Sequence, residues 1–256
     1  LVALPAALDA RLVEPAAVLL ERVCTARALL LRPGDAPRLM HAIGCILAPS
    51  AQKCRSGGGP TAPPHVFRAL VGCVGALVRL RKDIVSPFLP HLTQVICMLM
   101  PLLTSLADTH AGGAAVRELR EASPSWIDLA TAPLGVREAQ AFGRLLGELP
   151  AKSAPLVSSA IAHKRRRVDA GVQSLAGAMS KHAIYVLLAY VRCVTRVATT
   201  IAPPLREALY PGILALCSMI SHHERDAALK SLLDSPGQLV FKSIWADWER
   251  QRYRGA

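Results

Sequence analysis

Aromatic residues are scarce in this chain: they make up 4% of its 256 residues, although hydrophobic residues as a whole make up 52%. Sheet-rich domains favour aromatic and β-branched side chains, whereas Ala and Leu favour helices. A β-rich fold is therefore disfavoured. Acidic residues are also few, at 18 against 30 Lys and Arg, which gives a net charge of +12. This balance favours acidic partners, with nucleic acid before an acidic protein or a membrane surface.

Sequence motifs of catalysis and cofactor binding are missing. No Gly-rich phosphate loop, G-x-S-x-G or H-E-x-x-H occurs, and the carboxylates are scattered. Cys217, His222 and His223 match no zinc-site spacing, so a core cysteine beside helix-capping histidines is expected there. We therefore expect no enzyme activity, no metal, no cofactor and no small-molecule substrate.

The seven cysteines form no C-x-x-C pair, and most of them lie in apolar stretches. An odd number of this kind indicates reduced core thiols in a cytosolic or nuclear protein, not a disulfide framework. No signal peptide is visible, and no apolar run approaches the roughly 18 residues of a membrane span. The nearest run, Val95–Leu106, is interrupted by Pro101. No membrane contact is expected.

Helical periodicity recurs along nearly the whole chain. It predicts helices over residues 15–32, 36–48, 65–83, 86–107, 135–150, 180–201, 203–220, 221–233 and 235–254. Pro15 is expected in a first turn and Pro101 at a kink. The helices over 65–83 and 86–107 are expected to pair antiparallel.

Two helix starts carry capping patterns. Ser221 precedes Glu224 by three residues, and Ser235 precedes Gln238 by three, as in a capping box.

Successive helices joined by short loops predict an all-α fold, either an irregular α-solenoid of the ARM or HEAT type or a large antiparallel helical array. Four parts are expected: N-terminal helices (1–52), a helical-repeat segment (65–150), a basic flexible insertion (151–179) and a C-terminal helical segment (180–256). The chain begins with Leu1 and not Met, so a fragment of a longer protein is expected.

Basic clusters are the candidates for nucleic-acid contact or a nuclear address. Two are named by residue: Lys164, Arg165, Arg166 and Arg167, and then Arg250, Arg252 and Arg254. A third covers residues 77–82. A solvated loop, a nuclear address and a phosphate-binding arm all fit the first cluster. The second alternates with Trp248 and Tyr253, and aromatic rings beside arginines can stack on bases.

An apolar stripe accompanies the second basic cluster. Phe241, Ile244, Trp245 and Trp248 lie at helical spacing, so core packing is expected for the tryptophans and an outer face for the arginines.

Four segments of the C-terminal half together resemble the C-terminal domain of the "unhealthy ribosome biogenesis protein two" family. They are PLGVREAQAFGRLLGEL (133–149), KHAIYVLLAYVRCV (181–194), LREALYPGILALCSMISHHE (205–224) and LVFKSIWADWERQRYRG (239–255). Their order and spacing carry the resemblance, which covers residues 133–256 best. Members of that family are much longer, so the chain is expected to be a C-terminal piece.

The resemblance implies a non-catalytic scaffold of early nucleolar large-subunit assembly and pre-rRNA processing. It further implies assembly-factor partners that include a DEAD-box helicase, contact with pre-rRNA, and a nucleolar or nuclear location. The alternative is a HEAT- or ARM-type protein adaptor with a nuclear-localisation loop and no direct RNA contact.

Overall fold

The computed structural model describes residues 10–49, 63–106, 117, 121–129, 133–152 and 174–254, and most of them lie in helices. Its α-helices include α1 (Ala10–Ala26), α2 (Asp35–Leu47), α3 (Pro63–Leu80), α4 (Lys82–Val85), α5 (Leu89–Leu99), α7 (Val136–Glu148), α8 (Ala176–Thr195), α9 (Pro203–Cys217), α10 (His222–Ser231) and α11 (Ser235–Arg254). The 3-10 turns are η1 (Ala28–Leu30), η2 (Ser86–Phe88) and η3 (Met100–Leu103). Two short antiparallel strands, β1 (Ser105–Leu106) and β2 (Thr199–Thr200), pair with each other. The prediction of a mainly helical fold is confirmed.

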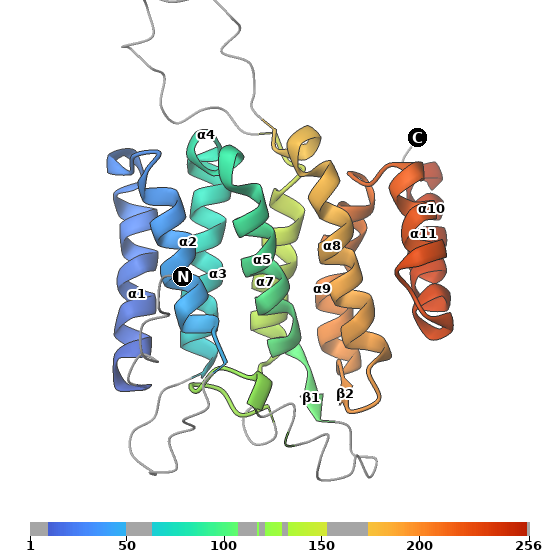
Figure 1. The fold of residues 1–256 in the computed structure, drawn as a ribbon, viewed down its shortest axis with the longest axis horizontal. Coiled ribbons are helices and arrows are strands. Elements are labelled where there is room, and N and C mark those ends of the chain that lie inside the picture. Colours follow the sequence, from blue (N-terminus) through green and yellow to red (C-terminus); the bar gives the residue numbers. More distant parts are fainter. Residues whose placement is uncertain are drawn as a thin grey trace, which may run out of the picture.

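The helices form two rows that run along the long axis of the molecule (Figure 1). In one row α1 packs on α3, α3 on α7, and α7 on α9. In the other row α2 packs on α5, α5 on α8, and α8 on α11. The helices over 65–83 and 86–107 were predicted to pair with each other. The closest neighbours of α5 are instead α2 and α8, because α3 and α5 belong to different rows.

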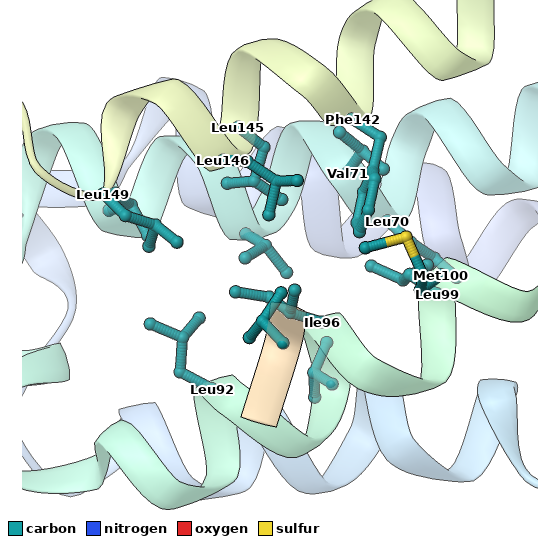
Figure 2. Packing of buried hydrophobic residues seen from close by; sticks show 14 of the residues in the cluster. Leu70, Val71, Leu92, Ile96, Leu99, Met100, Phe142, Leu145, Leu146 and Leu149 are labelled. Carbon is teal, nitrogen blue, oxygen red and sulfur yellow. The ribbon is translucent and has the colours of Figure 1, made fainter. Parts of the chain in front are cut away.

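The two rows meet in one hydrophobic core that extends from Val13 to Trp245. Figure 2 shows its centre, where side chains of α3, α5 and α7 interlock. Leu70 of α3, Ile96 of α5 and Phe142 of α7 are fully buried there. The helices of the two rows thus present apolar faces both to their own row and to the other row, which explains the high apolar content of the chain.

Most of the described cysteines belong to this core. Cys24, Cys73, Cys193 and Cys217 are buried, and none of the six described cysteines forms a disulfide. The Sγ atoms of Cys24 and Cys73 lie 3.2 Å apart, and they join α1 to α3. Burial raises the pKa of Cys193 and Cys217 to about 12, so both stay neutral thiols. The prediction of core thiols is confirmed for these residues.

Helix starts follow local chemistry, with one shift from the prediction. Ser221 caps α10, because its Oγ accepts from the Glu224 N–H at 3.2 Å while the Glu224 carboxylate accepts from the Ser221 N–H at 2.9 Å. For α11 the predicted cap, Ser235, is wrong by one residue. The Asp234 carboxylate accepts from the Gly237 N–H at 3.0 Å. A carboxylate is also favoured by the positive end of the helix dipole.

Two prolines behave differently from each other. Pro15 lies inside α1, which begins at Ala10, so the prediction of a first-turn proline is wrong. Pro101 lies in the first turn of η3, where the α-helical path of α5 tightens, as the predicted kink requires.

Within the described residues, Lys82–Leu103 is one stretch long and apolar enough for a membrane span, with a mean hydropathy of 1.4. The sequence-based prediction missed this stretch, because it rested on uninterrupted apolar residues. Half of the window is buried inside the protein, as is typical of a core helix.

Candidate nucleic-acid interface

An aromatic cluster joins α10 to α11 at the end of the molecule. The Trp245 ring stacks on Phe241 with centroids 6.2 Å apart, and it lies 5.0 Å from the ring of Trp248. His222 meets Trp245 edge-on at 6.3 Å. The indole N–H of Trp245 donates to Glu249 at 2.9 Å, which satisfies its buried donor. The cluster therefore holds both helices in a fixed relation.

The predicted core stripe of α11 is confirmed. Phe241, Ile244 and Trp245 are 1%, 3% and 6% exposed, and Trp248 is half-buried against the core. Trp248 thus packs with one part of its ring and keeps another part in reach of solvent.

Two arginines lie over these indole rings. The guanidinium of Arg225 lies 5.3 Å from the centroid of Trp245, and that of Arg252 lies 5.6 Å from the centroid of Trp248. Arg225 also pairs with Asp226 at 2.8 Å, and this hydrogen bond lowers the pKa of Asp226. Its environment makes Arg225 a structural cation. Arg252 is exposed, so its charge and the neighbouring ring of Trp248 are accessible to the same ligand.

A cavity of about 670 Å³ opens between α9 and this cluster. Trp245, Trp248 and Arg252 line one side, and His222 and Gln251 add polar groups. A flat aromatic ring, a cation and hydrogen-bonding side chains around one hollow suit a nucleobase that stacks while its phosphate meets the cation.

Arg250 and Arg252 point to different sides of α11. Residues two apart on a helix do not share a face. Arg250 pairs with Asp247 three residues earlier, whereas Arg252 lies over Trp248 four residues earlier. Both arginines are exposed, as expected for the outer face, but Arg252 lies on the side of the aromatic stripe.

Asp247 has a second partner, the phenol of Tyr210 on α9, whose O–H donates to the carboxylate. Burial, and then this hydrogen bond, raises the pKa of Tyr210 well above its usual value. Tyr210 therefore stays protonated and ties α9 to α11 behind Arg250.

For the other predicted site residues the structure describes no side chain. Arg254 ends α11, and its side chain falls outside the described residues. Lys164, Arg165, Arg166 and Arg167 also lie outside them.

The third basic cluster, residues 77–82, is mostly structural. Arg81 is 5% exposed, and its guanidinium donates to the carbonyls of Ala28 and Leu31 and to the carboxylate of Asp83. Lys82 is also 5% exposed and donates to the carbonyl of Ala151. The expectation of a third basic patch is therefore wrong for these two cations, which satisfy buried acceptors.

Arg225 and His222 were missed as members of the α11 cluster. They lie on α10, and only the packing of α10 against α11 brings them to Trp245. Helical spacing within one segment cannot reveal a contact between two segments. His222 was expected to cap a helix, but Ser221 does so, and His222 is the first residue of α10.

The described part of the chain contains no cluster of side chains that would form a metal site. Among the described residues, no group of three or more His, Cys, Asp or Glu side chains could hold a metal ion. Cys217 is fully buried in the core, away from an open ligand position.

Comparison with known proteins gives one family. The sequence model described as the Urb2/Npa2 family matches residues 14–256. This match confirms the resemblance found in the C-terminal half and extends it over most of the N-terminal half. No curated protein and no solved structure gives a significant match.

Proposed function

Because the chain belongs to the Urb2/Npa2 family, a family of ribosome-biogenesis factors, we propose that it is a non-catalytic scaffold in early nucleolar assembly of the large ribosomal subunit. The family match over residues 14–256 is the observation that carries this proposal. In this role the chain supports pre-rRNA processing from the nucleolus or nucleus, together with assembly factors that include a DEAD-box helicase.

The arrangement of the helices supports a scaffold. Two rows of stacked helices give a small chain long faces that can meet several partners at once. We propose that this arrangement is an irregular α-solenoid of the ARM or HEAT type, with the four parts predicted from the sequence.

Contact with pre-rRNA is the second part of the proposal. The net charge of +12 favours phosphate. The Trp248–Arg252 pair beside its cavity offers a ring for a base and a cation for a phosphate. Arg250, Arg254 and the run Lys164–Arg167 would add affinity that depends on salt and little on sequence.

Variants of α11 test the RNA contact. We expect Arg252→Ala to weaken binding of a single-stranded pre-rRNA fragment about tenfold, because it removes a phosphate contact and one side of the stacking site. Arg250→Ala is the matched control, because it removes the same charge from the opposite side of the helix. We expect it to weaken binding about two- to threefold, through charge alone.

Salt dependence then tests all seven cations. Replacing Lys164–Arg167, Arg250, Arg252 and Arg254 by Gln should reduce the slope of log affinity against log salt by about 0.7 for each phosphate that a removed cation neutralises. An unchanged slope would remove direct RNA contact from the proposal. The remaining interpretation would be a protein adaptor whose basic loop is a nuclear address.

A further inference from the structure

A cavity of about 630 Å³ lies between α5 and α8, beside the β1–β2 pair. Met98 and Leu102 line it from the α5 side, and Leu188 and Ala189 line it from α8. Its volume lies within the range of about 300–1,000 Å³ that is typical of binding pockets. We refer to this cavity as the α5–α8 groove. It has room for several apolar side chains of a bound segment.

Exposed apolar side chains continue the groove at its rim. Tyr185 on α8 is 55% exposed and Leu232 is 48% exposed, and both line the cavity. Solvated apolar groups beside an apolar hollow are typical of surfaces that a partner covers.

The charge of the groove has one sign. Arg192 and Arg196 are the charged side chains among its described lining residues, and both are exposed. Within the described part of the chain, no carboxylate forms an ion pair with Arg192. Cys97 and Cys193 in the lining stay neutral, because burial raises the pKa of the first to about 11 and of the second to about 12. An apolar hollow with positive charge on one side results.

The two arginines have a spacing that a helix can match. Arg192 lies in the last turn of α8, where the helix dipole favours cations, and Arg196 is the C-cap residue, whose N–H still donates to the Arg192 carbonyl. Residues four apart on a helix lie one turn, about 6 Å, from each other on the same face. Carboxylates four residues apart on a second helix have the same separation.

We propose that the α5–α8 groove binds an amphipathic helix of a partner protein, with apolar side chains in the hollow and acidic side chains one turn apart against Arg192 and Arg196. This assigns a partner chemistry to the proposed scaffold, on which it rests for its biological setting. Its test is a binding measurement that needs no ribosome assembly, so the two proposals can fail separately.

A synthetic probe tests the charge and the apolar part together. The probe is a fluorescein-labelled 16-residue amphipathic helix with a leucine face flanked by glutamates four residues apart. A second peptide carries lysine at every glutamate position. Fluorescence anisotropy should give the wild-type chain at least tenfold tighter binding to the glutamate peptide. The double variant Arg192→Glu with Arg196→Glu should prefer the lysine peptide.

A matched control separates the groove from the general positive charge. Arg22 on α1 and Arg144 on α7 are exposed and lie outside the lining of the groove. The double variant Arg22→Glu with Arg144→Glu has the same net charge as the groove variant. It should bind the glutamate peptide within about threefold of wild type. Equal losses of affinity in both double variants would overturn the proposal, because attraction would then come from overall charge.

Cysteine footprinting of the wild-type chain gives a second readout that needs no variant. Cys97 lines the groove, and Cys45 on α2 is similarly half-buried outside it. At an alkaline pH that ionises part of the Cys97 thiol, the glutamate peptide should slow iodoacetamide alkylation of Cys97 several-fold and leave that of Cys45 unchanged. Unchanged alkylation of Cys97 at saturating peptide would overturn the proposal. So would protection of Cys97 by a single-stranded RNA but not by the peptide, because the groove would then be a nucleic-acid site.

Discussion

A close approach of two helices, between α7 and α9, gives a sharp stability test. Gly212 of α9 faces Gly143 of α7, and a Cβ built on Gly212 would lie 2.4 Å from the Gly143 carbonyl oxygen and 2.9 Å from the Cβ of Leu146. A Cβ on Gly143 would lie 2.7 Å from the carbonyl oxygen of Ala208. Because the blocking atoms belong mainly to backbone, neither contact can be relieved by a side-chain rotation.

The expected cost of Gly212→Ala combines two opposing effects. Alanine favours the helix by about 1 kcal/mol over glycine. Overpacking of a close contact typically costs about 1–3 kcal/mol, and backbone neighbours place this site at or above the upper end of that range. We therefore expect a net loss of about 2 kcal/mol in the free energy of unfolding. For a chain of this size that corresponds to a Tm lower by roughly 4–8 °C.

Urea unfolding followed by far-UV circular dichroism measures this change. Gly147→Ala is the control in α7, because a Cβ there would meet no atom within 4 Å. It should leave the free energy of unfolding unchanged or raise it by up to about 1 kcal/mol. A Gly212→Ala variant as stable as Gly147→Ala would refute the close packing of α7 on α9.

Three further outcomes are expected. Arg81→Met leaves two buried carbonyls without a donor, so it should lower the free energy of urea unfolding by about 2–4 kcal/mol. Arg79 is more exposed, so Arg79→Met should lower it by less than about 1 kcal/mol. Equal losses in the two variants would contradict a structural role for Arg81. The hydrogen bond from Arg81 lowers the pKa of Asp83. The stability that this pair contributes is therefore present above about pH 4 and is lost as pH falls through the folded-state pKa of Asp83. In Arg81→Met the free energy of unfolding should therefore fall less between neutral and acid pH than in wild type. The same pH dependence in both proteins would contradict this role of the Arg81–Asp83 pair. Ser221→Ala should cost about 1 kcal/mol of stability, and a neutral result would contradict its capping role.

The helices could be predicted from the sequence because each depends on neighbours along the chain. Apolar periodicity located α11 at its observed bounds and found α8 with its ends shifted by four and six residues, and the capping pattern at Ser221 placed the start of α10. Even here the local rule has limits. At α11 two capping residues, Asp234 and Ser235, follow each other, and the carboxylate is the one that accepts the hydrogen bond.

The rows could not be predicted, because they depend on contacts between distant segments. Helices that follow each other in sequence, such as α3 and α5, belong to different rows, so adjacency in sequence did not reveal that α5 packs most closely on α2 and α8. The same reason hid the role of Arg81, whose acceptors Ala28 and Leu31 lie 53 and 50 residues away. The sequence shows that Arg81 is charged, but it does not show which buried carbonyls accept its hydrogen bonds.

The candidate interface was predicted in part. Trp248 and Arg252 could be paired from their spacing of four residues, which places them on one helix face. Arg225 entered only through the packing of α10 on α11. The opposite directions of Arg250 and Arg252 follow from helix geometry, which composition alone did not use.

We propose above all that this chain is a ribosome-assembly scaffold that contacts pre-rRNA through its C-terminal face. Ultraviolet crosslinking in cells, followed by RNA sequencing and peptide mapping, tests this most directly. We predict crosslinks to large-subunit pre-rRNA on the α11 peptide that holds Trp248 and Arg252. Their yield should fall about tenfold in Arg252→Ala and by no more than about two- to threefold in Arg250→Ala. Crosslinks confined to other RNA, or absent from this peptide while the chain co-purifies with assembly factors, would contradict the proposal.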